Sequence, residues 1–185
     1  MNLYLLMTAI FILMASLMAA DAALTSFTLV PWFNGLRWLR VHLITLGAMT
    51  EALFGLLPLI VAIRAGRSRP AFRWDIWLTL NLGLLTLLVA IPIVNQALIF
   101  VGGTLVFIAT TLLLIQLHGL AAQHPEGVDQ ENGRSYNGRP FYIAGLSYFL
   151  LGIIVGTGLW LGWSGWLRIQ VPVEVHIHAN NWGFL

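Results

Sequence analysis

Long apolar runs separated by short polar connections dominate this chain. An α-helix needs about 20 apolar residues, at a rise of about 1.5 Å each, to cross a bilayer. Five runs approach or reach that length: Leu3–Ala20, Val41–Ile63, Ile76–Val94, Ala97–Leu117 and Phe141–Trp163. Tryptophans and arginines flank several of them, as is typical of membrane interfaces. The pattern predicts an all-α, polytopic transmembrane helix bundle, with residues 1–185 forming a single transmembrane domain.

The last stretch, V-P-V-E-V-H-I-H-A-N-N-W-G-F-L, begins like a further span but is too short to be one. Fourteen residues remain from Pro172 to the end, and proline and Glu174 both suit a helix N-terminus. This interpretation gives five complete spans and a truncated sixth, so that the chain is a fragment of a longer protein. The alternative is an extended segment, because polar and apolar residues alternate from Val171 to His178 with a period of two.

Residues 118–139 form the one long polar segment, which predicts a solvated loop. The distribution of arginines predicts on which side of the membrane this loop lies, because loops rich in arginine stay in the cytoplasm. The connections after the second and fourth runs contain six: Arg64, Arg67, Arg69, Arg73, Arg134 and Arg139. Those after the first and fifth contain three: Arg37, Arg40 and Arg168. We therefore expect a multi-pass protein of the plasma or inner membrane, with the N-terminus and the 118–139 loop in the cytoplasm.

Composition supports a lipid environment and narrows the possible chemistry. The chain is 59% hydrophobic and only 9% charged, which is outside the range of soluble domains, so the lipid bilayer is its expected partner. The basic residues lie at the ends of apolar runs, which indicates topology and not nucleic-acid binding. The absence of cysteine excludes thiolate ligands and iron–sulfur clusters. Any metal must therefore be held by other side chains, with histidine foremost.

Three histidines are candidates for metal or cofactor binding. His42 opens the second run, and α-helical spacing places Thr45, Leu46, Met49, Leu53 and Leu56 on its face. A row of apolar residues of this kind is typical of a helix face that packs against haem, and also of an ordinary buried helix face. His176 and His178 would point about 200° apart on a helix, and on a strand they would share a face with Glu174. On a helix we expect His176 to approach His42 from the outer side of the membrane, with His178 peripheral.

Polar residues inside the runs suggest supporting roles. Glu51 falls near the middle of the second span, where an ionisable group is a candidate for proton passage or bonds a neighbouring helix. Asn81 lies within the third span and is expected to bond helices together. Asn180 lies one helical turn beyond His176, where it could orient a ligand or a water molecule.

Two segments carry a resemblance to a known family. V-H-L-I-T-L-G-A-M-T-E-A-L-F-G-L-L-P, from Val41, resembles the second helix of haem–copper oxidase subunit I-like proteins, which begins with a haem-ligating histidine. V-E-V-H-I-H-A-N-N-W-G-F resembles the start of the sixth helix in divergent members, where the oxidases place a copper ligand. The resemblance implies a twelve-helix fold of which this chain covers the first half. It also implies haem on His42 and copper on His176 or His178.

The chain departs from the oxidases at the sixth helix. Their His-Pro-Glu-Val-Tyr type motif is replaced by His176-Ile177-His178-Ala179-Asn180, which lacks the tyrosine. A non-oxidase relative, similar to the haem- and copper-containing membrane proteins of the nitric-oxide response, fits equally well. The expected function is therefore haem and copper binding with a redox or nitric-oxide- or oxygen-linked role. The alternatives are a transporter or channel using Glu51 and Asn81, or a structural subunit that binds other membrane subunits.

Overall fold

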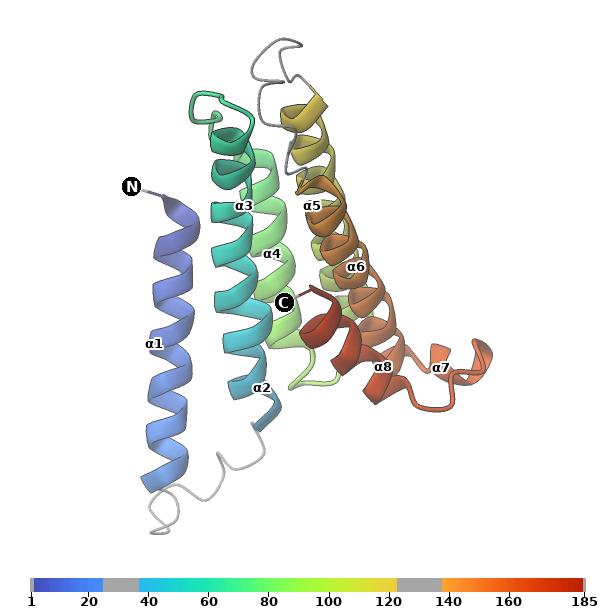
Figure 1. The fold of residues 1–185 in the computed structure, drawn as a ribbon. Helices are drawn as coiled ribbons and strands as arrows, with labels where there is room; N and C mark the ends of the chain where they lie inside the picture. Colours follow the sequence, from blue (N-terminus) through green and yellow to red (C-terminus); the bar gives the residue numbers. More distant parts are fainter. Residues whose placement is uncertain (1, 25–36, 123–137, 185) are drawn as a thin grey trace.

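The computed structural model describes residues 2–24, 37–122 and 138–184, and every regular element within these ranges is a helix. The helices stand side by side, as Figure 1 shows, with the last ones packed across the lower part of the bundle. Apolar side chains fill the space between helices, among them Phe11, Phe54, Leu80 and Leu113. The all-α prediction is confirmed for these residues.

The first two helical rods pack closely because glycines face aromatic rings. α1 (Leu3–Leu24) runs beside a composite rod of α2 (Arg37–His42), the π-helix η3 (Leu43–Met49) and α3 (Thr50–Arg64). A Cβ added at Gly47 would lie 2.8 Å from the Phe11 ring, and one at Gly55 would lie 2.7 Å from the Tyr4 Cβ. Small residues at such contacts let helices approach within a membrane. α1 and the composite rod are therefore in direct contact.

The next three helices continue the bundle in sequence order. α4 (Trp74–Ala90) and α5 (Gln96–Ala122) form a hairpin in which Gly83 meets Val106. α6 (Arg139–Leu161) packs on α5, where Gly103 faces the Thr157 side chain. Gly162 ends α6 with a φ of +75°, a left-handed conformation that glycine adopts without a Cβ penalty. The chain can thus turn sharply away from the bundle.

The segment after that turn is helical and folds back onto α6. α7 (Trp163–Trp166) projects to the side, with Trp166 83% exposed, and α8 (Pro172–His178) then continues into a second π-helix, η5 (Ala179–Phe184). The extended alternative for residues 171–178 is wrong. Pro172 stands in the first turn, where its missing N–H costs nothing.

Among the residues that the structure describes, four helical stretches are long and apolar enough to cross a membrane: Leu3–Leu24, Trp38–Arg64, Gln96–Leu120 and Pro140–Leu161. The third expected span, Ile76–Val94, is shorter than we expected, because α4 ends at Ala90 and has 17 residues. The loop expected at 118–139 begins later than we expected, since α5 continues through His118 to Ala122. Residues 123–137 of that loop lie outside the described part of the chain.

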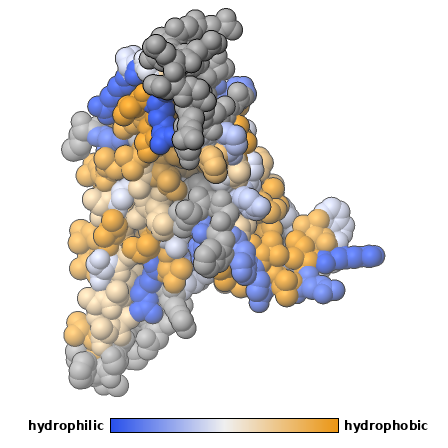
Figure 2. Space-filling view, viewed as in Figure 1, coloured by the Kyte–Doolittle hydropathy of each residue, from blue (hydrophilic) through white to orange (hydrophobic). Residues whose placement is uncertain are grey.

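The outer surface matches a lipid environment. Many large apolar side chains are exposed on the outward faces of the helices, including Leu13, Leu17, Ile63, Val89 and Ile115. Figure 2 shows hydrophobic residues over the middle of the visible face and hydrophilic ones at its upper end and along the projecting segment. A contiguous apolar belt of this kind is what bilayer lipid covers. The described helices are therefore suited to a membrane.

Candidate metal site

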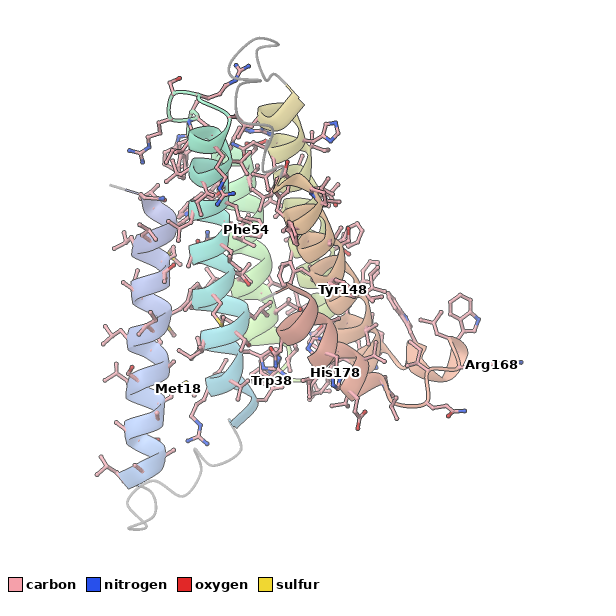
Figure 3. The ribbon with its side chains drawn as sticks, in the orientation of Figure 1. Met18, Trp38, Phe54, Tyr148, Arg168 and His178 are labelled. Atoms are coloured by element: carbon pink, nitrogen blue, oxygen red, sulfur yellow. The ribbon has the colours of Figure 1, made fainter. Side chains whose placement is uncertain are left out.

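His42 and His176 meet at one end of the bundle. Their imidazole centroids are 6.3 Å apart and their planes differ by 13°. His42 is the last residue of α2 and His176 lies in the middle of α8, so 134 positions of sequence separate them. The expected approach of these two histidines is confirmed. Figure 3 shows the same end of the bundle, where Trp38 of α2 lies near His178 of α8.

The backbone of α2 fixes the His42 ring. Its Nδ1 lies 2.8 Å from the carbonyl oxygen of Trp38, one turn earlier, and the Trp38 ring stacks on the imidazole at 3.9 Å. A carbonyl oxygen can only accept a hydrogen bond, so Nδ1 must carry the proton. The Nε2 lone pair of His42 is then available to a ligand.

The backbone of α6 fixes the His176 ring in the same way. Its Nδ1 donates to the carbonyl oxygen of Gly152 at 2.8 Å, which again leaves the Nε2 lone pair available. This hydrogen bond holds a metal-ligating histidine in one tautomer and one orientation. Burial lowers the pKa of His176, and the bond to Gly152 opposes that shift. The neutral ring, which is the form that binds metals, is therefore favoured at neutral pH.

Two glycines of α6, Gly152 and Gly156, leave a space that the His176 and Asn180 side chains fill, and we call this space the slot. A Cβ at Gly156 would lie 2.5 Å from His176 Cε1, and one at Gly152 would collide with the Asn180 amide. These glycines stand four residues apart, so they share one face of α6, as do His176 and Asn180 on the facing segment. We did not predict this slot from the sequence. The G-I-I-V-G spacing from Gly152 to Gly156 does indicate a helix face that allows close packing.

Asn180 supports His176 from the next turn, as the sequence analysis expected. Its Nδ2 donates to the backbone oxygen of His176 at 2.7 Å. It also lies 3.2 Å from His176 Nδ1 without bonding to it, because that nitrogen is the donor to Gly152. The side chain therefore braces the backbone of His176 and lies beside its ring. This contact restricts the movement of His176 relative to α6.

His178 and Glu174 do not join the pair. Both side chains are exposed, and His178 Nδ1 donates to the Glu174 carbonyl oxygen at 2.7 Å. His176 and His178 point in different directions because residues two apart do not share a helix face. Within the described ranges no cluster of three or more His, Cys, Asp or Glu could hold a metal ion. His42 and His176 thus remain as a two-histidine site.

A π-helix follows both His42 and His178, which the sequence analysis did not expect. η3 begins at Leu43 and η5 at Ala179, directly after each histidine. The two segments share a pattern, V-H-L-I-T-L-G from Val41 and I-H-A-N-N-W-G from Ile177, which could have signalled the relation. π-helical turns are rare and frequently mark functional sites.

The wider turn in η3 changes which residues of the second span pack inward. The stripe expected on the His42 face ends at Leu56, which is exposed, whereas the buried positions include Leu43, Gly47, Glu51 and Phe54. An α-helical register through this segment was therefore a wrong assumption.

Glu51 and Asn81 lie away from the histidines, buried between the composite rod and α4. A cavity of about 320 Å³ lies at the opposite end of the bundle from His42, and its lining includes Tyr4, Arg69 and Trp74. Neither Glu51 nor Asn81 lines it. The described polar groups therefore fall into separate regions and not along one continuous path.

No protein-family model matches the chain, and no curated protein or solved structure matches it at a significant level.

Proposed function

We propose that this is an integral membrane protein that binds a redox-active metal, haem iron, between His42 and His176. The observation that carries the proposal is the pair of near-parallel imidazoles, each with Nδ1 bound to a backbone carbonyl. α4 serves as a fifth, short span, and the excess of arginines after the second and fourth runs places the N-terminus in the cytoplasm. The histidine pair then lies near the outer face.

The donor atoms of the two rings fit a metal ion. His42 and His176 would hold it through Nε2, since each Nδ1 is bound to a backbone carbonyl. Imidazole nitrogens suit iron, copper and zinc.

The resemblance to haem–copper oxidase subunit I-like proteins favours haem over a free ion at this pair. His42 occupies the position of the haem-ligating histidine in the resembling segment. Haem held by these histidines would supply one-electron transfer. This chain's own contribution is to hold two imidazoles neutral and correctly oriented, and to cover one of them with Trp38.

Copper is the second candidate for the same nitrogens, because imidazole also suits copper. A copper ion shared by His176 and His178 does not fit α8, where the two rings diverge. A copper ion on His178 would need ligands from outside the described residues. The two-histidine pair is therefore the better place for either metal.

The transporter and channel alternative receives less support. Such a protein needs Glu51 and Asn81 beside a polar pathway, and the described cavity reaches neither residue. A purely structural subunit does not require two histidines whose Nε2 atoms are both left available. The histidine pair therefore favours metal binding over these two classes.

The test is an absorption spectrum of the full chain purified in detergent from haem-replete cells, with its metal content measured. We expect a Soret band typical of haem with two imidazole ligands, which His42→Ala and His176→Ala should each remove or shift.

His178→Ala is the matched control, because it removes an exposed histidine two residues from His176 and should leave the spectrum unchanged. Copper without a Soret band would assign the pair to copper. A purified protein with neither haem nor stoichiometric metal would refute the proposal, as would unchanged spectra in both ligand variants.

A further inference from the structure

The Glu51 carboxyl is buried inside the bundle without a hydrogen-bond partner. Glu51 is 0% exposed, and both carboxyl oxygens are unpaired. Its neighbour across the helix interface is Asn81 of α4, which is 6% exposed and interacts with the carboxyl. A buried polar group without a partner costs about 1–3 kcal/mol, and more if it is charged.

Most of the unpaired polar atoms lie on Glu51 and on α4, the helix that carries its partner Asn81. Five buried side-chain atoms within the described ranges lack a hydrogen-bond partner, and four of them belong to Glu51, Asn81 and Trp77. One N–H of Asn81 Nδ2 donates to the Trp77 carbonyl, whereas Asn81 Oδ1 has no partner.

Counting donors and acceptors shows what a proton adds at Glu51. With Glu51 ionised, its two carboxylate oxygens and Asn81 Oδ1 are three acceptors, and the second N–H of the Asn81 amide is a donor. One added proton removes the buried charge and turns a carboxylate oxygen into a donor. The carboxyl O–H can then donate to Asn81 Oδ1, the amide that interacts with this carboxyl.

We propose that Glu51, with Asn81, forms a proton-binding site in the interior of the bundle. It holds one exchangeable proton on the carboxyl group. The site is separate from the histidine pair and stands whether or not a metal binds there.

The charged surroundings are compatible with a neutral carboxyl group. Tyr4 of α1 is the titratable side chain that interacts with Glu51 from the neighbouring helix. The nearest charged residues that also act on Tyr4 are Asp75 and Arg73, which pair with each other at 2.5 Å at the start of α4. Arg73 does not compensate an ionised Glu51, because it is bound to Asp75.

A monovalent cation is the alternative occupant of the site. Two carboxylate oxygens and one amide oxygen are hard ligands, but they are only three. The cation is therefore an outcome for the experiment to separate.

The test is infrared difference spectroscopy of the full chain in lipid nanodiscs, comparing H₂O with D₂O at neutral pH in potassium buffer. We expect a carbonyl band from a protonated carboxyl that shifts in D₂O and disappears in Glu51→Gln. Asn81→Leu should move the band to higher frequency, because it removes the acceptor of the O–H group. Glu174→Gln removes an exposed carboxyl and is the matched control, which should keep the band.

Three results would overturn the proposal. The first is the absence of the band from the wild type at neutral pH. The second is its survival in Glu51→Gln. The third is its replacement by a carboxylate band when sodium is added in place of potassium, which would identify a cation site.

Discussion

Gly156→Ala tests whether the slot on α6 positions the histidine pair. The added methyl carbon would lie 2.5 Å from His176 Cε1 and 2.6 Å from Nδ1, whereas carbon atoms in contact prefer about 3.5–4.0 Å. The ring must therefore move by about 1 Å. Such a shift lengthens the 2.8 Å bond from Nδ1 to Gly152 beyond hydrogen-bonding distance.

The magnitude follows from two terms. Losing a hydrogen bond costs about 1 kcal/mol net, and forcing a methyl group into a packed interface costs about 1–3 kcal/mol. We therefore expect about 2–4 kcal/mol less stability for the contact between α6 and α8. Loss of a bond that orients a metal ligand typically weakens metal binding by about 10–100-fold.

The assays are haem or metal titration followed by absorbance, and thermal unfolding in detergent. Gly119→Ala is the matched control, since Gly119 is a helical glycine of α5 with open space around it, and alanine there should stabilise by about 1 kcal/mol at most. Equal ligand affinity in Gly156→Ala and Gly119→Ala would refute the positioning role of the slot.

Three further outcomes follow from the same structure. Gly83→Ala places a Cβ 2.9 Å from the backbone nitrogen of Val106, so thermal unfolding should show a loss of about 1–3 kcal/mol; an unchanged melting temperature would contradict the close α4–α5 contact. Because burial lowers the pKa of His176, its ring stays neutral below about pH 6.5, the ordinary value for histidine. In a pH titration followed by the Soret band, the protein should therefore release haem only at a more acidic pH. Release at or above about pH 6.5 would contradict this expectation. Glu51 lies nine residues after His42, about 13 Å along the helix, where a charge change is worth about 1 kcal/mol. Spectroelectrochemistry of Glu51→Gln should therefore show a weaker pH dependence of the metal potential, and an unaltered dependence would show that the two sites are independent.

The apolar runs were sufficient to predict the helices but not their ends. Periodicity and length identify a helix, whereas capping and packing decide where it stops. α5 runs on to Ala122, past the polar His118, because a helix end can project into water without cost to its backbone bonds. α4 stops at Ala90, and a turn at residues 91–94 precedes Asn95, so its apolar length falls below that of a full span. Arginine counting gave an orientation that stays a prediction.

The sequence was sufficient to select the two histidines as candidate ligands, but not to predict the contacts that orient them. The shared chemistry of His42 and His176 is visible in the sequence, but their approach depends on contacts between distant segments. Two glycines of α6 must clear the space, and a Gly152 carbonyl must stand where the ring can reach it. None of these features has a local signal at either histidine. The buried cluster at Glu51 was likewise foreseen as two separate polar residues, and only the fold reveals that their unpaired atoms lie together.

Removing the π-helix η3 tests whether the histidine pair depends on it. A π turn contains more residues than an α turn, so deleting one exposed residue from η3, Ile44, should restore an α-helical register. The deleted residue is the one that the wider turn accommodates, so α2 and His42 should keep their direction relative to α3. The packing of α3 against α1 and α5 is extensive and should hold α3 in place.

The variant lacking Ile44 should therefore keep its helix content, its elution volume in detergent and a haem or metal binding that still depends on His42. The same deletion made in α1, at exposed Leu13, is the control, because it should disturb packing without changing the helix that carries His42. Ligand binding that is lost in the Ile44 deletion but kept in the Leu13 deletion would mean that the π-helix itself sets the direction of the ring.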